Sequence, residues 1–200
     1  MDENISLTLK IIILGASEVG KTSILDRYFK DEFRENRLST IGVDFQTKFF
    51  KFEGKNIKGI YTDTAGQEKF RAISVNYLKA ANGVILVFDI TKEETFEALE
   101  EWLKYLKDNG KDDIQKILIG NKLDLEKNRK VTKEDAEDFA KSNGCKYFET
   151  SAKTGVNVNE ALDEIARITY LSKTGKAEGD KEKNIVLNKN SPDTKKKKCC

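Results

Sequence analysis

The sequence predicts an α/β fold of the doubly wound type: a six-stranded, mostly parallel sheet with one antiparallel edge strand and helices on both faces. Two observations support this prediction. Short, continuously apolar runs such as 83–88 and 114–119 are typical of parallel strands covered on both faces. Amphipathic stretches lie between such runs, and repeated strand-helix-strand units with short connections build a parallel sheet.

Local patterns define the single elements. The turn Glu53-Gly54-Lys55 predicts a tight hairpin between two neighbouring strands. The stretch 95–107 has apolar residues at helical spacing, and Thr132 with Asp135 three positions later predicts a capped helix start. In chain order, the expected strands are 7–14, 43–52, 57–62, 83–88, 114–119 and 145–148, and the expected helices are 21–29, 95–107, 132–142 and 157–171.

The chain is expected to form one domain with a tail. Its 200 residues suffice for a single good core. We assign 1–173 to this domain and 174–200 to a flexible tail, because Lys, Asn, Ser, Gly, Asp and Thr dominate there. Residues 172–200 carry nine lysines and four acidic residues, a net charge of +5, whereas the whole chain has +2. The body is therefore slightly negative, and nucleic acid is not an expected partner.

Several classes of protein are excluded by composition. The chain has no histidine, which excludes Ser-His-Asp hydrolysis, Cys-His proteolysis and histidine-ligated metals. Its three cysteines form no disulfide framework and are too few for a zinc site. No apolar run approaches the roughly 20 residues of a membrane span, and residues 1–10 lack the apolar core of a signal peptide. We expect the protein to meet any membrane from the cytosol.

A phosphate-binding loop is predicted at Gly15-Ala-Ser-Glu-Val-Gly-Lys-Thr22. The segment fits G-x-x-x-x-G-K-[ST] and lies after a predicted strand and before a predicted helix. Its glycines let successive backbone N–H groups face phosphates, next to a helix N-terminus. Lys21 would reach the β- and γ-phosphates, and the Thr22 hydroxyl would bind Mg²⁺. The alternative is a simple glycine-containing turn capped by Thr22, and the strand and helix on either side favour the phosphate-binding loop.

A second motif, Asp63-Thr-Ala-Gly-Gln67, follows the strand expected at 57–62. An acidic residue at that strand end can hold Mg²⁺ through water, and Gly66 can offer its N–H to a γ-phosphate. Gln67 is neutral and can orient a water without repelling it from the triphosphate. Asp-x-x-Gly alone is more often an ordinary turn. Next to a phosphate-binding loop, the functional interpretation is favoured.

Two further motifs predict the base. Asn121-Lys-Leu-Asp124 follows the strand expected at 114–119. Asp124 can accept hydrogen bonds from N1–H and N2–H₂ of guanine, whereas adenine would leave the carboxylate unpaired, at a cost of roughly 1–3 kcal/mol or more. Ser151-Ala-Lys153 follows the last strand, and the N–H of Ala152 can reach guanine O6. Isolated, Asn-Lys-x-Asp is weak evidence; at this strand end it favours guanine.

Together these residues resemble a known family. The matching segments, in order and at family spacing over roughly 7–171, are GASEVGKT, STIGVDF (39–45), DTAGQEKFR (63–71), VFDIT (87–91), NKLD (121–124) and TSAK (150–153). They resemble the Ras superfamily of small GTPases. STIGVDF, QEKFR and the terminal Cys199-Cys200 resemble its Rab family in particular.

The resemblance implies a P-loop NTPase fold, a bound GTP or GDP, and Mg²⁺. It implies that Thr40 binds Mg²⁺ and the γ-phosphate, that Phe33 lies against the guanine, and that the nucleotide controls switch I (33–43) and switch II (63–78). Gln67 and Lys21 are the implied catalytic residues, and Thr22, Thr40 and Asp63 the metal-binding ones. The implied nucleotide contacts are Ser17, Glu18, Val19, Gly20, Lys21, Thr22, Ser23, Phe33, Thr40, Gly66, Asn121, Lys122, Asp124, Ser151, Ala152 and Lys153.

Two residues depart from the Rab pattern. Glu18 replaces a small residue inside the phosphate-binding loop, and we expect its side chain to point to solvent. Thr62 replaces a tryptophan that forms, with Phe45 and Tyr77, an aromatic patch read by effectors in the family. The choice of effector is therefore not transferable from relatives. The chain's single tryptophan, Trp102, lies on the helix expected at 95–107 and is interpreted as a packing residue.

The end of the chain resembles the Rab double geranylgeranylation site. Cys199 and Cys200 are the last residues, so they do not form a C-a-a-X box. Two lipid chains exceed what marginal one-chain anchoring provides, at roughly 0.8 kcal/mol per buried CH₂. The four lysines 195–198 would add about 1 kcal/mol each near an anionic leaflet. We therefore expect a location on the cytoplasmic face of an intracellular or plasma membrane, with a cytosolic pool.

The sequence is compatible with three functions. A regulated GTP/GDP switch in vesicle trafficking is favoured, with slow intrinsic hydrolysis because no arginine in the same chain is identified for the transition state. The family then implies an exchange factor, an activating protein, effectors, a prenylation escort and a dissociation inhibitor, acting on a monomer. A P-loop kinase or ATPase would need an acceptor pocket and an arginine-bearing lid, and neither is recognisable. A non-hydrolysing scaffold is conceivable because of Glu18, but Gln67, Thr40 and Asp63 are retained.

Overall fold

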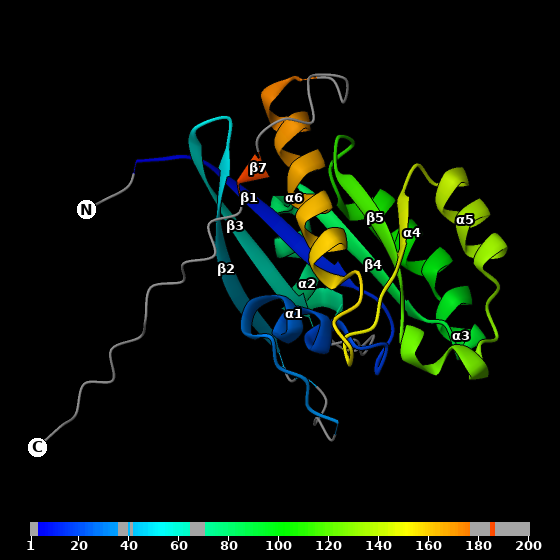
Figure 1. Ribbon diagram of the computed structural model, residues 1–200. Coiled ribbons are helices and arrows are strands. Elements are labelled where there is room, and N and C mark those ends of the chain that lie inside the picture. Colours follow the sequence, from blue (N-terminus) through cyan, green and yellow to red (C-terminus); the bar gives the residue numbers. More distant parts are fainter. Residues whose placement is uncertain (1–3, 36–39, 41, 65–70, 177–184, 187–200) are drawn as a thin grey trace, which may run out of the picture.

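The computed structural model describes residues 4–35, 40, 42–64, 71–176 and 185–186. Within them, one sheet runs through the molecule in the strand order β6-β5-β4-β1-β3-β2-β7 (Figure 1). The strands are β1 (Ile5–Leu14), β2 (Val43–Phe52), β3 (Lys55–Thr64), β4 (Gly83–Asp89), β5 (Gln115–Asn121), β6 (Lys146–Glu149) and β7 (Ile185–Val186). The helices are α1 (Lys21–Lys30), α2 (Arg71–Ala80), α3 (Glu93–Glu97), α4 (Leu99–Asn109), the 3₁₀ helix η2 (Leu123–Asn128), α5 (Lys133–Ser142) and α6 (Val158–Thr174).

The predicted fold class is confirmed. All six expected strands are present; β1, β3, β4, β5 and β6 are parallel, and β2 is antiparallel to β3 at the edge of this six-stranded core. The short β7 was not predicted; it falls in the expected tail and pairs antiparallel with Lys51 and Phe52 of β2. The domain boundary and the flexible tail stay predictions, and 177–184 and 187–200 lie outside the described residues.

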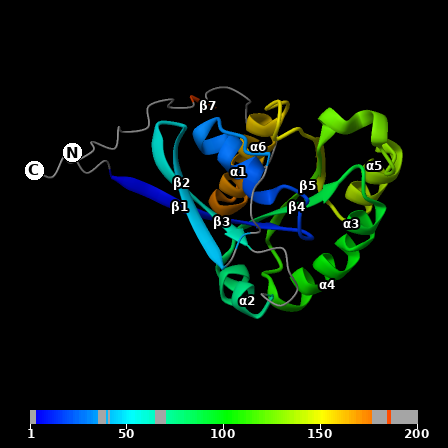
Figure 2. The same cartoon turned by 90° about the horizontal axis from the view of Figure 1, so that it is seen from below.

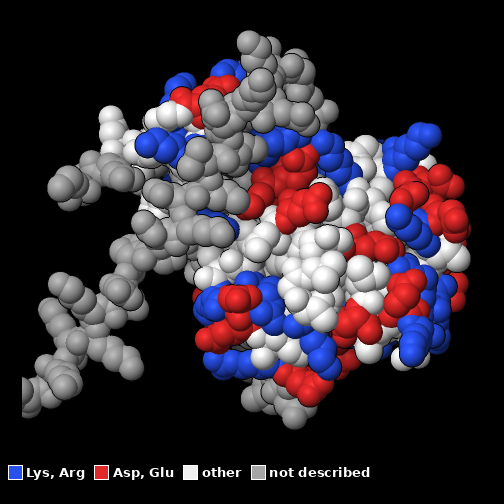
Figure 3. All heavy atoms as spheres, viewed as in Figure 1, with Lys and Arg blue, Asp and Glu red and all other residues white. Residues whose placement is uncertain are grey.

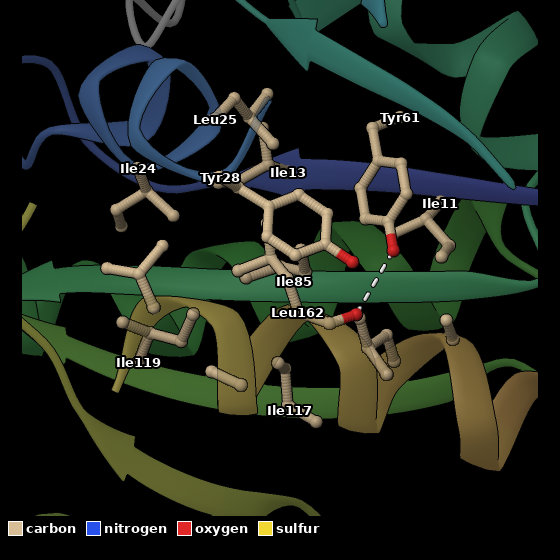
Figure 4. Close-up of a cluster of buried hydrophobic side chains, with 14 of the residues drawn as sticks. Ile11, Ile13, Ile24, Leu25, Tyr28, Tyr61, Ile85, Ile117, Ile119 and Leu162 are labelled. Atoms are coloured by element: carbon tan, nitrogen blue, oxygen red, sulfur yellow. Dashed lines mark hydrogen bonds between the residues drawn. The ribbon is translucent and has the colours of Figure 1, made fainter. Parts of the chain in front are cut away.

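Successive side chains of a strand point to opposite faces of the sheet, so each face has a hydrophobic core of its own. Ile11 and Ile13 belong to the core beneath α1 and α6, whereas Ile12 and Leu14 belong to the core beneath α2, α4 and α5. The two helical layers lie on opposite sides of the sheet in Figure 2, and Figure 4 shows the first core between α1, β1, β4, β5 and α6. Both faces of the central strands are therefore covered by helices and shielded from solvent, as their continuous apolar runs predict.

The helices differ from the prediction in three places. The helix expected at 95–107 is divided at Ala98 into α3 and α4, although Ala98 keeps helical dihedrals (φ −61°, ψ −14°). Helix α2 and η2 were not predicted; the buried Leu78 and Ala81, three residues apart, are the signal that could have located α2. The cap of α5 is confirmed, because the Asp135 N–H donates to Thr132 Oγ1 at 3.1 Å.

The described surface carries both charges. On the face seen in Figure 3, Lys and Arg side chains are interspersed with Asp and Glu. Several form close pairs, such as Arg167 Nε with Glu164 Oε2 at 2.6 Å and Lys146 Nζ with Glu164 Oε1 at 2.5 Å. Pairs of this kind contribute little to stability, typically about 0–1 kcal/mol each, so the two apolar cores dominate the folding free energy.

A polar cluster joins α1, β2 and α6 at the margin of the first core. The Tyr28 hydroxyl donates to Asp163 Oδ1. Lys48 Nζ lies 3.5 Å from the centre of the Tyr28 ring and 3.9 Å from Asp163 Oδ1. Burial raises the pKa of Asp163, while the Tyr28 hydrogen bond and the Lys48 charge act in the opposite direction. The cluster therefore depends on Tyr28 to keep a half-buried carboxylate ionised.

We expect Tyr28→Phe to destabilise the protein by about 1–2 kcal/mol at neutral pH, because Asp163 loses its hydrogen-bond donor. The pKa of Asp163 in the folded state then rises further above its unfolded value. The folded state holds this proton over a wider pH range, so the loss of stability is largest at neutral pH and shrinks as pH falls through the Asp163 pKa.

Urea unfolding at neutral and mildly acidic pH measures this effect. Thr174→Val is the control, because the Thr174 hydroxyl donates to a backbone carbonyl, that of Tyr170, at 2.9 Å. That acceptor does not titrate, so the loss in the control is expected to be independent of pH. Equal pH profiles for the two variants would show that Asp163 is not coupled to Tyr28.

Candidate functional site

The loop between β1 and α1 depends on glycine and on Lys21 for its shape. Gly20 has a φ of 95°, and a Cβ at this position would lie 2.4 Å from Asn121 Nδ2, so only glycine fits. Lys21 Nζ donates to the carbonyl oxygens of Gly15 at 3.0 Å and Ala16 at 2.8 Å. The ammonium is therefore held inside the loop, at the N-terminus of α1.

Oxygen atoms suited to a hard cation lie beside this loop. Thr22 Oγ1 and Thr40 Oγ1 are 2.7 Å apart, which brings two predicted metal ligands together from segments 18 residues apart. Asp63, near the end of β3, is 1% exposed. Burial lowers the pKa of Lys21 to about 8, although the negative charge of Asp63 acts in the opposite direction. Two hydroxyls and one carboxylate are ligands that Mg²⁺ accepts alongside waters and phosphates. The residues present fit a magnesium ion.

Asn121 connects three strand ends at the other side of the site. Its Nδ2 donates to the Val19 carbonyl at 2.8 Å, and its Oδ1 accepts from Thr150 Oγ1 at 3.1 Å and from the Ala152 N–H at 3.2 Å. All of these atoms are buried, with Asn121 1% exposed. One amide thus fixes the phosphate-binding loop relative to the loops that follow β5 and β6.

The loops after β5 and β6 are also tied to each other. Ser151 Oγ donates to Asp124 Oδ1 at 2.6 Å, which orients the carboxylate that is expected to bind guanine. From α1, Arg27 clamps the same loop: its Nε donates to the Ala152 carbonyl at 2.9 Å and its Nη2 to the Lys153 carbonyl at 2.8 Å. These hydrogen bonds fix the Asp124 carboxylate and the backbone of Ala152 and Lys153 in the absence of a nucleotide.

Lys122 is held by an acidic residue of a third strand. Its Nζ lies 2.6 Å from Oδ2 of Asp89, the last residue of β4, which is 0% exposed. The other oxygen, Asp89 Oδ1, accepts from the N–H and the hydroxyl of Thr91. Because its ammonium is engaged in this way, Lys122 offers its aliphatic stem to the cavity.

A cavity of about 470 Å³ joins these groups, within the range of small-molecule sites. The structure brings together Ser17, Glu18, Gly20, Lys21, Thr22, Ser23, Phe33, Thr40, Asn121, Lys122, Asp124, Ala152 and Lys153 as predicted lining residues, and adds Arg34, Glu35, Thr64 and Leu125. Val19, Ser151 and Asp63 do not line the cavity. Gly66 and Gln67 lie outside the described residues, as does most of switch II.

Sequence reasoning missed several residues that shape the site. Asp89 and Thr91 were noted only as part of the motif 87–91, although an acidic residue at a strand end is the signal used for Asp63. Arg27 carries no such signal, because its partner Ala152 lies 125 residues away. Neither does Arg34, which lines the cavity while its Nη2 pairs with Glu32 at 3.2 Å.

Glu18 points to solvent, as expected. Its side chain is 72% exposed, and its Oε2 lies 3.2 Å from Lys92 Nζ at the start of α3. The backbone of Glu18 has a φ of 64°, a left-handed conformation that costs a non-glycine residue about 1 kcal/mol. The carboxylate therefore points to solvent and to Lys92, and the backbone of Glu18 is strained.

We expect Glu18→Gly to change GDP release by less than about fivefold, because an exposed ion pair contributes at most about 1 kcal/mol. Thermal stability is expected to change little, since relief of the left-handed strain opposes the entropy that glycine loses on folding. Release of a fluorescent GDP analogue measures the rate, with Lys92→Gln as the control that removes only the ion pair. A tenfold or larger change would show that Glu18 acts on the phosphates.

The two aromatic residues of the expected effector patch are in contact. The ring centroids of Phe45 and Tyr77 are 5.3 Å apart, and Phe45 is 50% exposed. Thr62 pairs with Phe45 across the strands and is 6% exposed. Trp102 is 3% exposed in the second core, which confirms its interpretation as a packing residue.

Known proteins are similar to this chain over most of its length. The Ras family matches residues 10–170, and the Ras-related protein Rab-13 of Mesocricetus auratus is 43% identical over 174 residues, 87% of this chain and 86% of that protein. The chain belongs to the Ras family, as a Rab-type member. Ras-related protein Rab-10 of Diplobatis ommata is 39% identical over 194 residues (97% and 96% of the two chains), and Ras-related protein Rab-8A of Bos taurus is 40% identical over 171 residues (86% and 83%).

Membership has direct consequences for the cavity. Ras-family proteins of the Rab type are GTPases, so GTP and GDP are its nucleotides and the chain is a GTP hydrolase. Such proteins act through regulators and effectors. Among the described helices, none is long and apolar enough to cross a membrane.

Proposed function

We propose that this Rab-type protein is a membrane-anchored switch of vesicle trafficking, which binds Mg²⁺ and GTP and hydrolyses GTP slowly. One observation carries the proposal. Groups suited to phosphates, to a hard cation and to guanine lie at the ends of β1, β3, β5 and β6 around one cavity of about 470 Å³. Ligands of doubly wound sheets bind at this edge.

Phosphates are bound by Lys21 and by the N-terminus of α1. The Lys21 ammonium exchanges its present carbonyl partners for the more negative β- and γ-phosphate oxygens, which raises its pKa from about 8. Mg²⁺, when bound, neutralises charge that develops on the phosphates. Thr22 and Thr40 would hold it through their hydroxyls, and Asp63 would do so through water.

Guanine is recognised by Asp124, which Ser151 orients, and by the Ala152 N–H, which shares its hydrogen between Asn121 Oδ1 and the oxygen at position 6 of the base. Phe33 is half-buried at the cavity and supplies an aromatic surface for the base. The Lys122 stem is expected on the opposite side, since its ammonium is occupied by Asp89. These contacts favour guanine over adenine, because adenine lacks the N1–H and N2–H₂ donors that pair with Asp124.

Hydrolysis is assigned to Gln67, which orients the attacking water, and to Lys21, which stabilises the transferred phosphoryl group. The one described arginine of the cavity, Arg34, pairs with Glu32, so slow intrinsic turnover and stimulation by an activating protein are expected. Loss of the γ-phosphate ends its contacts with Thr40 and Gly66, and switch I (33–43) and switch II (63–78) relax. An exchange factor then replaces GDP by GTP.

Two prenyl groups on Cys199 and Cys200 are proposed to hold the protein on the cytoplasmic face of an intracellular or plasma membrane, with the lysines 195–198 adding attraction to anionic lipids. A prenylation escort would deliver the protein, and a dissociation inhibitor would maintain its cytosolic pool. Truncation after residue 194 is expected to leave nucleotide binding intact and to abolish membrane recovery of protein from cells.

Single-turnover phosphate release from protein loaded with GTP tests the proposal. The expected result is slow release that requires Mg²⁺ and falls at least tenfold in Gln67→Leu, with GDP affinity unchanged. Absence of release, with GTP still bound, would instead establish the non-hydrolysing scaffold. Transfer of phosphate to an added acceptor in place of water would establish the kinase alternative.

A further inference from the structure

A second connection between the two base-binding loops, those after β5 and β6, lies outside the cavity. The first is the hydrogen bond from Ser151 to Asp124. The second is an ion pair: Arg129 directly follows η2, and its Nη1 lies 2.8 Å from Oε1 of Glu149, the last residue of β6. Neither Arg129 nor Glu149 lines the cavity. An effect of this pair on a nucleotide must therefore act through other residues of the two loops.

The ion pair is largely shielded from solvent. The side chain of Arg129 is 16% exposed and that of Glu149 14%. Charges in such a place are screened less than surface charges, and removal of one partner leaves the other uncompensated. The Tyr147 hydroxyl donates to the same carboxylate oxygen at 2.9 Å. A Cβ at Gly120 would lie 2.6 Å from this hydroxyl, so the network rests against the end of β5, next to Asn121.

Arg129 has a second carboxylate partner, which offers an internal comparison. Its Nε donates to Glu126 Oε1 at 2.9 Å and its Nη2 to Glu126 Oε2 at 2.6 Å. Glu126 belongs to η2 itself, and its side chain is 56% exposed. This pair lies within one short segment and is open to solvent, so it is expected to contribute little. The contact with Glu149, in contrast, joins the loop after β5 to the end of β6.

Two side-chain attachments set the orientation of η2. At its beginning, Asp124 is bound by Ser151. At its end, Arg129 is bound by Glu149, whose backbone pairs with Gly120 in the sheet. A 3₁₀ helix of six residues is about 12 Å long, so loss of the far attachment lets it rotate about the near one. Rotation changes the direction of the Asp124 carboxylate, and hydrogen bonds weaken steeply when donor and acceptor are misaligned.

We propose that Arg129, through its ion pair with Glu149, positions Asp124 for the 2-amino group of guanine and thereby determines the preference for guanine over purines that lack this group. The inference rests on the proposed guanine site and names a positioning residue outside it. When the pair is broken, Asp124 can still accept from N1–H of the base. The second hydrogen bond, from N2–H₂, is lost because both bonds form together only when the carboxylate lies in the plane of the base.

Displacement of labelled GDP from the full-length protein by GDP and by inosine diphosphate tests the proposal. The base of inosine diphosphate keeps N1–H but lacks the 2-amino group, so the ratio of the two affinities reports on the second hydrogen bond alone. We expect the unaltered protein to prefer GDP at least tenfold. This ratio is expected to fall at least fivefold in Arg129→Gln, and at least threefold in Glu149→Gln, where the amide oxygen accepts a weaker, uncharged bond.

Two further variants separate positioning from mere stability. Arg129→Lys keeps a charge that can reach Glu149 and is expected to retain the ratio within about twofold, and Glu126→Gln is expected to leave it unchanged. Unfolded protein binds neither nucleotide, so partial unfolding cannot alter the ratio.

Equal losses of affinity for GDP and inosine diphosphate in Arg129→Gln would overturn the proposal, because the pair would then only stabilise the loops. A fall of the ratio in Glu126→Gln as large as in Arg129→Gln would do the same. If the unaltered protein already binds both nucleotides equally, the proposed guanine site itself is wrong, an outcome distinct from failure of the variants.

Discussion

Asp124→Asn is expected to exchange guanine for xanthine as the preferred base. The carboxylate accepts from N1–H and N2–H₂ of guanine, and the amide of asparagine would present a donor to the guanine N2–H₂ group. The variant loses a charge-assisted hydrogen bond and places one donor against another. Together these two effects cost about 3–4 kcal/mol, roughly a 100- to 1000-fold loss of GTP affinity. Xanthine has an oxygen at position 2, which accepts from the new amide.

Competition of guanosine and xanthosine triphosphates against a labelled diphosphate measures the exchange. The remaining asparagine oxygen can still accept from Ser151 Oγ, which lies 2.6 Å from Asp124 Oδ1, so the loop is expected to stay folded. Glu126→Gln on η2 is the control, because Glu126 pairs with Arg129 on the surface. Unchanged GTP affinity in Asp124→Asn would mean that the base lies elsewhere in the cavity.

Asn121→Asp is expected to destabilise the protein by about 3 kcal/mol and to weaken nucleotide binding. One carboxylate oxygen can keep the bonds from Thr150 and Ala152. The other replaces Nδ2 at 2.8 Å from the Val19 carbonyl, so two buried acceptors face each other. The phosphate-binding loop then loses its hydrogen bond to β5. A bound nucleotide must order the loop itself, which lowers the affinity.

Denaturant unfolding without nucleotide and GDP titration measure the two effects. Asn109→Asp is the matched control; Asn109 Nδ2 also donates to a backbone carbonyl, that of Tyr105 at 3.0 Å, but is only half-buried at the end of α4. The control is expected to lose about 1 kcal/mol, from one hydrogen bond and a charge near a helix C-terminus. Equal losses in the two variants would show that Asn121 does not connect the loops.

Much of the fold and the site could be predicted because their signals are local. Continuous apolar runs identified the central strands, and the glycine-rich loop, Asp63, Asn121 and Asp124 each come after one of the predicted strands. Parallel strands place such residues at one edge of a sheet, so chain order alone brought most of the predicted contacts to one cavity. Thr40 required the family resemblance, since it does not directly follow a predicted strand or helix.

Other features depend on contacts between distant segments. Arg27 binds the Ala152 carbonyl across 125 residues, and Glu18 meets Lys92 across 74. No local pattern predicts such pairs. The pairing of β7 with β2 was missed for a similar reason: Ile185 and Val186 stand in a polar segment and gain a partner only from the strand edge.

The cavity is proposed to select a guanine nucleotide. Displacement of labelled GDP from the full-length protein by increasing GTP, and separately by ATP, tests it most directly. We predict displacement by equimolar GTP and no displacement by ATP at a roughly 1000-fold excess, because adenine leaves Asp124 unpaired. Displacement by ATP at concentrations similar to those of GTP would show that the cavity does not select guanine.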